Sequence, residues 1–223
     1  MPEETDKPTI KPVAKRYYDY VSVGKRTKQV AYFVEQHDKT AMFEQLIKNS
    51  DKKQIVVMVK SKRNADALSK YLKEKDISAT VIHGNHRVEQ IEEAGKAFNA
   101  GEINILITTD MILKSLNLTN IQQILSYDLP LKAEEYFVRL SYVDEIGESI
   151  SFVTLDEEKV LETIEFMMKL EMPQEELEGF TPTPAPQGKR LGQRFKDQKK
   201  KPRHSKKRVK KKSCNFTSVR MLK

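Results

Sequence analysis

The chain has 223 residues, which is enough for one α/β domain with a core and flanking tails. No apolar run approaches the roughly 20 residues needed to span a membrane, and the acidic, polar N-terminus is unlike a signal peptide. The single cysteine, Cys214, excludes an internal disulfide and fits a reducing compartment. We therefore expect a cytoplasmic protein without membrane association.

The net charge of +8 conceals a division of the chain into two parts. Residues 187–223 contain 16 of the 40 Lys and Arg residues but only one of the 32 acidic residues, Asp197. Residues 1–186 therefore carry an acidic excess. An asymmetry of this kind indicates a basic interaction tail attached to an acidic body.

The first 29 residues are polar, contain several prolines and have neither a helical nor a strand period, so we interpret them as an arm. Strand-like and helix-like segments then alternate. The expected strands are 30–36, 54–60, 78–84, 103–110, 121–130 and 149–155, and the expected helices are 38–50, 64–75, 88–101, 132–143 and 156–171. This alternation predicts βαβ units and a mostly parallel sheet flanked by helices.

The composition changes after Met172. Residues 173–188 include the Pro-rich stretch TPTPAPQG, which we interpret as a linker. Residues 189–223 form a basic tail that we expect to be disordered until it meets a polyanion. The sequence thus predicts an arm (1–29), one α/β domain (30–172), a linker (173–188) and a tail (189–223).

Several segments at the expected strand ends, taken together and in order, resemble a known family. VVMVKSKRNADALSKYL, VIHGN, FNAGEINILITTD, ILSYDLP and ISFVT are similar to the second, C-terminal RecA-like domain of DEAD-box RNA helicases. The resemblance covers roughly residues 27–157, and residues 12–29 weakly resemble the linker that precedes this domain. It implies a single RecA-like domain, and the Gly-x-x-x-x-Gly-Lys-Ser/Thr loop and Asp-Glu-Ala-Asp box of a first domain do not occur in this sequence.

The sequence departs from the family at the positions that contact the nucleotide. Where the family has Ala-Arg-Gly-Leu-Asp after TTD, this chain has LKSLN, so Lys114 replaces an arginine and Asn117 the ribose-binding aspartate. The family's later two arginines in His-Arg-x-Gly-Arg-x-Gly-Arg, which reach the γ-phosphate, are Tyr142 and Glu145 here. Because an arginine finger contributes roughly 10³–10⁵ in rate, we predict a degenerate nucleotide site with no catalytic residues.

Other family positions persist, and the resemblance implies that they hold an RNA backbone. These candidates are Ser61, Lys62, Arg63, Gly84, Thr109, Asp110 and Arg139. Hydroxyl and backbone N–H groups at such positions fix phosphates without reading sequence. The alternatives are a turn at Gly84, a helix cap at Thr109–Asp110 and a solvated helix start at Lys62–Arg63. Arg139 aligns with the family's first arginine, so we expect a structural or RNA-side role.

The tail predicts binding to nucleic acid, chiefly RNA. Its 14 Lys and Arg residues between 189 and 212 can neutralise several phosphates. The candidate tail residues are Lys189, Arg190, Arg194, Phe195, Lys199, Lys200, Lys201, Arg203, Lys206, Lys207, Arg208, Lys210, Lys211 and Lys212. Other acidic partners remain an alternative, and a protein partner on the body is also open.

The leading hypothesis is an RNA-binding, catalytically degenerate helicase C-terminal-like protein acting on RNA or ribonucleoprotein. No cofactor is expected, and ATP with Mg²⁺ would enter only if a partner supplied the first RecA-like domain. The alternatives are half of a split or truncated ATP-dependent RNA helicase, and a remnant without a selected function.

Overall fold

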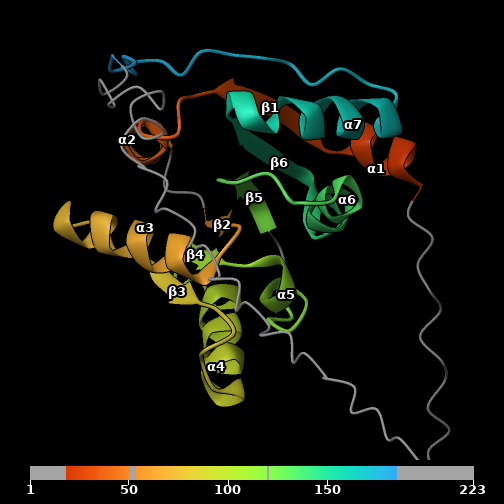
Figure 1. The fold of residues 1–223 in the computed structure, drawn as a ribbon. Coiled ribbons are helices and arrows are strands. Elements are labelled where there is room, and N and C mark those ends of the chain that lie inside the picture. The colour runs from red at the N-terminus through yellow and green to blue at the C-terminus, as the bar shows by residue number, and fades with distance from the viewer. Residues whose placement is uncertain (1–18, 51–53, 120, 185–223) are drawn as a thin grey trace, which may run out of the picture. The chain divides into compact units, whose positions relative to one another are not determined.

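The structure is a computed structural model that describes residues 19–50, 54–119 and 121–184 (Figure 1). These residues form strands and helices in alternation. In chain order the elements are α1 Tyr20–Arg26, β1 Lys28–Phe33, α2 Lys39–Asn49, β2 Ile55–Met58, α3 Lys62–Glu74, β3 Thr80–Ile82, α4 Val88–Asn99, β4 Ile105–Thr108, α5 Asp110–Leu113, β5 Ile121–Ser126, α6 Ala133–Ser141, β6 Val143–Val153, the 3₁₀ turn η1 Leu155–Glu157, and α7 Glu158–Met168.

The six strands form one sheet in the order β1-β6-β5-β2-β4-β3, and every pairing between neighbours is parallel. All four residues of β2 and of β4 are buried, as the continuous apolar runs IVVM and ILIT predicted. The predicted class, a single α/β RecA-like domain with helices flanking a parallel sheet, is confirmed for the body of the chain.

The helices cover both faces of the sheet. On one face, α2 and α3 pack on side chains such as Val57, Ile107 and Leu125. On the other face, α4 and α5 pack on Val56 and Leu106. A third cluster joins α6 and α7 to β1 and β6 on that second side. Adjacent residues of one strand thus pack against helices on opposite faces of the sheet, as expected because side chains alternate along a strand.

The arm extends less far than the sequence suggested, because residues 20–26 form helix α1 and β1 begins at Lys28. The helix is short, and its support is tertiary. The Tyr20 ring lies 4.5 Å from the ring of Phe137, and Gly24 is buried against Met168. A seven-residue segment with an internal glycine has too little helical period to be recognised without these contacts.

The segment after α7 also differs from the expected linker. Gln174 forms a parallel bridge with Ala31, and Leu177 is buried in the α2–α3 cluster. Thr183 donates from its backbone N–H and its hydroxyl to the Asp38 carboxylate. Residues 173–184 therefore pack on the domain. In the described segments, no helix is long and apolar enough to cross a membrane.

A further departure lies between α6 and β6. The predicted helix 132–143 ends at Ser141, and β6 starts at Val143, well before the expected residue 149. Along the β5–β6 pair, β6 advances from Val143 to Glu148 while β5 advances only from Ile121 to Gln123. Gly147 suits this irregular stretch, because a Cβ there would lie 2.9 Å from the Gln122 carbonyl oxygen.

Gly95 provides a test of the packing of α4 on the sheet. Replacing a helical glycine by alanine normally stabilises a helix by up to about 1 kcal/mol. At Gly95, however, a Cβ would lie 2.2 Å from the backbone carbonyl oxygen of Leu116. We expect Gly95→Ala to lower the free energy of unfolding by roughly 1–3 kcal/mol, measured by urea denaturation. Lys96→Ala, an exposed change in the same helix, serves as the control, and stabilisation by Gly95→Ala would contradict this packing.

Candidate nucleic-acid interface

Four adjacent parallel strands, β2 to β5, end at the same edge of the sheet, and a cleft of about 500 Å³ lies there. Its lining comes from the segments that follow these strands and from α6. The lining residues are Lys60, Ser61, Lys62, Gly84, Thr109, Asp110, Met111, Pro130, Leu131 and Glu135. Carboxyl ends of parallel strands are the usual binding edge of such sheets. The structure thus brings five of the seven predicted body residues that we assigned to RNA into one cleft.

The N-terminus of α3 opens onto this cleft. Ser61 is the N-cap, and its hydroxyl accepts a hydrogen bond of 3.2 Å from the Asn64 N–H. The Lys62 ammonium reaches across to the β3–α4 loop and donates to Asn85 Oδ1 at 2.6 Å. Gly84 lies beside this side chain, and a Cβ there would be in ordinary van der Waals contact with Lys62 Cε, at 3.4 Å. Partial positive charge at the helix start and two lysines, Lys60 and Lys62, favour an anion here.

Arg139 does not line the cleft, although the sequence allowed it an RNA-side role. It is 1% exposed and makes two hydrogen bonds to the Asp110 carboxylate, at 2.6 and 2.8 Å. Its Nη1 donates to Ser126 Oγ and to the Asp128 carbonyl oxygen, both at 2.9 Å. A guanidinium held in this way has a structural role, because it joins the ends of β4 and β5 to α6. Arg63 is exposed on α3 and also lies outside the cleft lining.

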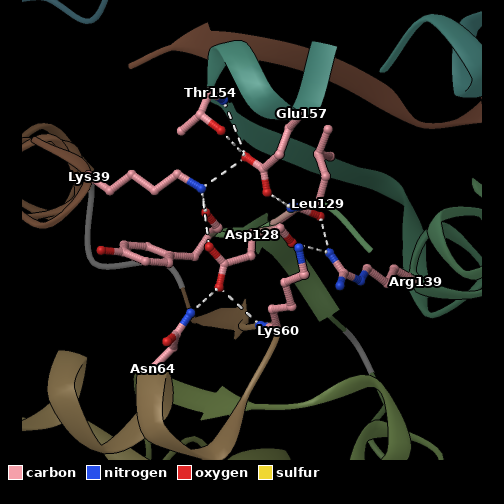
Figure 2. A network of polar contacts seen from close by, with 10 residues as sticks. Lys39, Lys60, Asn64, Asp128, Leu129, Arg139, Thr154 and Glu157 are labelled. Atoms are coloured by element: carbon pink, nitrogen blue, oxygen red, sulfur yellow. Dashed lines mark hydrogen bonds and ion pairs between the residues drawn. The ribbon is translucent and has the colours of Figure 1, made fainter. Parts of the chain in front are cut away.

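Beside Arg139 lies a buried polar network centred on Lys39 (Figure 2). The Lys39 ammonium has no exposed surface and donates to the Tyr127 carbonyl oxygen, Asp128 Oδ1 and Glu157 Oε2, at 2.9, 3.1 and 3.0 Å. All three of its N–H groups therefore have acceptors. Glu157 in turn accepts from the backbone N–H groups of Leu129 and Thr154, at 3.1 and 3.2 Å. The network thus sets one cation against two carboxylates, and backbone N–H groups supply the remaining donors to Glu157.

Asp128 connects the network to the cleft. Its second oxygen accepts from the Lys60 N–H at 3.0 Å and from the Asn64 amide at 2.9 Å, so it fixes the turn between β2 and α3. Burial by itself would raise the pKa of the Asp128 carboxyl. The charge of Lys39 and the hydrogen bonds from Lys60 and Asn64 outweigh this effect, and the pKa lies below its ordinary value of 3.8.

The positions assigned to the degenerate nucleotide site lie apart from the cleft lining. Lys114 is the exposed C-cap of α5, and Asn117 has a positive φ of 48° in the following loop. Tyr142 is the C-cap of α6 and packs against the apolar cluster under α4 and α5. Position 145 lies within β6, and the Glu145 side chain is outside the described residues, as is the whole tail of residues 189–223.

None of the three ionic residues of the buried network, Lys39, Asp128 and Glu157, was predicted from the sequence as a site residue, although Asp128 lies within the segment ILSYDLP. A lysine at the start of a helix reads as a solvated residue, and no pattern in the sequence marks Lys39 as buried. Glu157 did carry a signal, because Thr154-x-x-Glu157 has the spacing of a capping box, and the structure forms that box.

Comparison with known proteins agrees with this architecture. Residues 38–141 match the family model "Helicase conserved C-terminal domain". The chain is 31% identical over 135 residues to the ATP-dependent RNA helicase vasa of Drosophila melanogaster, which covers 60% of this chain and 18% of vasa. It is 31% identical over 115 residues to the ATP-dependent RNA helicase FAL1 of Mycosarcoma maydis, covering 50% of this chain and 29% of that protein. The first of these matches thus spans about a fifth of the relative's length.

Solved structures give the same result. The DEAD-box protein SrmB of E. coli, bound to the regulator of ribonuclease activity A, aligns with a TM-score of 0.64 at 18% identity, over 73% of this chain and 98% of that one. A DEAD box protein from Methanococcus jannaschii aligns with a TM-score of 0.61 at 26% identity, over 69% and 43%. The C-terminal domain of the DEAD-box protein Dbp5 gives 0.63 at 21%, over 68% and 91%.

The body of the chain therefore has the RecA-like fold of helicase C-terminal domains. More particularly, it is similar to the second RecA-like domain of DEAD-box RNA helicases, as the sequence predicted, and the protein resembles RNA helicases.

The depressed pKa of Asp128 predicts an acid-sensitive fold. An ionised Asp128 stabilises the fold fully above its ordinary pKa of 3.8, and this stabilisation is lost as the pH falls through the lower folded-state value. We expect Asp128→Asn to cost about 3 kcal/mol at pH 7 and to reduce the dependence of stability on pH below about 4. Urea unfolding between pH 2.5 and 7, followed by circular dichroism, measures both. The exposed change Glu74→Gln is the control, and parallel pH curves for Asp128→Asn and the unmodified chain would contradict the prediction.

Proposed function

We propose that this protein binds an RNA backbone in the strand-end cleft, that its basic tail supplies most of the affinity, and that it does not hydrolyse ATP by itself. One observation carries the proposal: five of the seven positions that the resemblance assigns to RNA meet in one cleft, while the positions of the family's two γ-phosphate arginines are Tyr142 and Glu145.

The cleft suits a phosphate backbone more than a base-specific ligand. Its cationic side chains, Lys60 and Lys62, are exposed, and Ser61, the N-cap of α3, belongs to its lining. The carboxylate of Asp110 is already neutralised by Arg139 at 2.6 Å, so it repels a phosphate less than its charge suggests. Met111 and Leu131 are 79% and 74% exposed and add apolar surface for ribose or base. Contacts of these kinds fix position and carry little sequence preference.

The body alone should bind RNA weakly, because its charge is acidic overall and the cleft offers few cations. The tail, with 14 Lys and Arg residues between 189 and 212, provides the long-range attraction that the body does not. Binding through many phosphates releases counterions, so affinity falls steeply with salt. The tail would thus set affinity, and the cleft would set how the RNA lies.

The tail and the cleft can be tested separately in the full chain. We expect Lys→Gln changes at 199, 200, 201, 210, 211 and 212 to weaken binding of a single-stranded RNA at least tenfold near 0.1 M salt. The slope of log K against log salt should fall by roughly 4. We expect Lys60→Glu with Lys62→Glu to weaken binding about tenfold with a smaller change in slope. Fluorescence anisotropy over a salt series measures both effects.

A matched control for the cleft is Lys70→Glu with Lys73→Glu, two exposed lysines of α3 away from the cleft lining. If this pair weakens binding as much as the cleft pair, the cleft has no specific role. If the tail variant keeps the affinity and salt slope of the unmodified chain, the role of the tail is wrong.

A second candidate is half of a split or truncated ATP-dependent RNA helicase. It is favoured by the names of the relatives, which are ATP-dependent RNA helicases. The part of each relative that matches this chain is about a fifth of its length. Tyr142 and Glu145 argue against it, since neither offers a guanidinium to a phosphate. We expect no RNA-stimulated ATP hydrolysis when the chain is mixed with a purified first RecA-like domain of a DEAD-box helicase. A phosphate-release assay decides, and stimulated turnover that depends on both proteins would favour the split helicase.

A further inference from the structure

Strand β1 is an edge of the sheet, and the segment that follows α7 passes along its outer side (Figure 1). The Val34 N–H donates to the Val153 carbonyl oxygen of β6 at 2.9 Å. Because alternate residues of a strand direct their backbone groups to opposite sides, Ala31 and Phe33 direct theirs away from β6. The direction is confirmed at Ala31, whose N–H donates to the Pro173 carbonyl oxygen at 2.8 Å and whose carbonyl accepts from the Glu175 N–H at 3.1 Å.

In the described part of the chain, the segment after α7 forms backbone hydrogen bonds with this edge only at Ala31, and its Phe180 and Pro182 lie beside Phe33. Its bridge to β1 is the single pair of Ala31 and Gln174, and in the described part of the chain no hydrogen bond extends it to Phe33. The next outward N–H and C=O along the edge, those of Phe33, are therefore left for another partner. The Phe33 side chain is also 39% exposed, which is unusual for an aromatic residue of a strand in this sheet.

Two grooves meet at Phe33. The larger, of about 900 Å³, lies between β1, α7 and the segment 171–174, and Leu161 and Met172 form part of its floor. The second, of about 550 Å³, lies toward α2 and is lined by Met42, Leu177 and Phe180. A strand edge with an unpaired outward N–H and C=O, an apolar groove on one side and a more polar groove on the other has the form of a site that accepts an added strand.

The walls of both grooves are acidic. Glu158, Glu162, Glu165 and Glu171 line the larger groove, and Glu175 and Glu176 line the smaller one. Among the described residues that line them there is no lysine or arginine. This charge disfavours RNA, and it disfavours a second copy pairing edge to edge, which would bring two acidic walls together. It favours a cationic polypeptide.

We propose that the β1 edge at Phe33 is a docking site for an extended segment of a separate protein, in which Lys or Arg residues alternate with apolar residues. The segment would add to the sheet beside Phe33 through its backbone. Its apolar side chains would enter the smaller groove, on the α2 face, and its cations would extend into the larger groove, on the α7 face, where Glu158 and Glu162 lie. Main-chain hydrogen bonds would give such a site affinity, and the alternating side chains would give it specificity.

The test uses the full chain and three seven-residue peptides with blocked ends: alternating Lys and Val, alternating Glu and Val, and alternating Lys and Pro. The Lys–Pro peptide has the charge of the first but no N–H at every second residue. We expect the Lys–Val peptide to bind at least fivefold more tightly than the other two. We also expect it to slow hydrogen exchange of the Phe33 amide about tenfold, measured by NMR. Equal binding of both cationic peptides, or unchanged exchange at Phe33, would overturn the proposal.

Variants of the chain separate backbone pairing from charge. Phe33→Pro removes the outward N–H without removing a hydrogen bond to β6 and should weaken Lys–Val binding at least tenfold, whereas Phe33→Leu should not. Glu158→Gln with Glu162→Gln should weaken it about fivefold, and Glu92→Gln with Glu93→Gln, exposed on α4, should have no effect. Equal effects of the two glutamine pairs would overturn the site. A peptide that copies residues 189–212 completes the comparison. If it slows hydrogen exchange at Phe33 more than the Lys–Val peptide does, the proposal of a separate protein partner is overturned.

Discussion

A lysine without exposed surface determines the geometry of the strand ends. Removing an ammonium from water costs several kcal/mol unless acceptors replace the water, and Lys39 finds three, on Tyr127, Asp128 and Glu157. These acceptors come from the end of β5 and from η1, so the start of α2 is tied to segments 88 or more residues later in the chain. Since Asp128 also holds the Lys60 N–H, the wall of the cleft rests on the same buried charge.

The Arg139–Asp110 pair extends this arrangement to the other side of the cleft. Arg139 donates to the Asp128 carbonyl oxygen as well as to Asp110, and thereby joins both sets of polar contacts at one residue (Figure 2). The sequence positions that resemble helicase motifs thus divide in two. Asp110 and Arg139 support the backbone, and Lys60, Lys62 and the loop at Gly84 face the cleft. Residues of one motif-like segment can therefore differ in role, some fixing the backbone and others facing the cleft.

Most of the fold could be predicted because burial of one face of a helix, or of a whole strand, leaves a regular pattern of apolar residues in the sequence. The runs IVVM and ILIT and the spacing of Leu68 and Leu72 follow directly from which faces are covered. Lys39 could not be found in this way, since its burial depends on acceptors distant in the chain. Helix α1 was missed because the ring of Phe137 and the side chain of Met168, not its own period, support it. The cleft was predicted in part, because the sequence pattern shows where the strands end. The orientation of Arg139 into the core was not predicted.

The short connection between α6 and β6 also determines the backbone on which positions 142 and 145 stand. One residue, Tyr142, separates the end of the helix from the start of the strand, and the following residues pair irregularly with β5. An arginine introduced at 142 would extend from a helix cap packed on the core, and one introduced at 145 from a strand within the sheet. Two substitutions would therefore change the side chains at these positions and leave the secondary structure that presents them as it is.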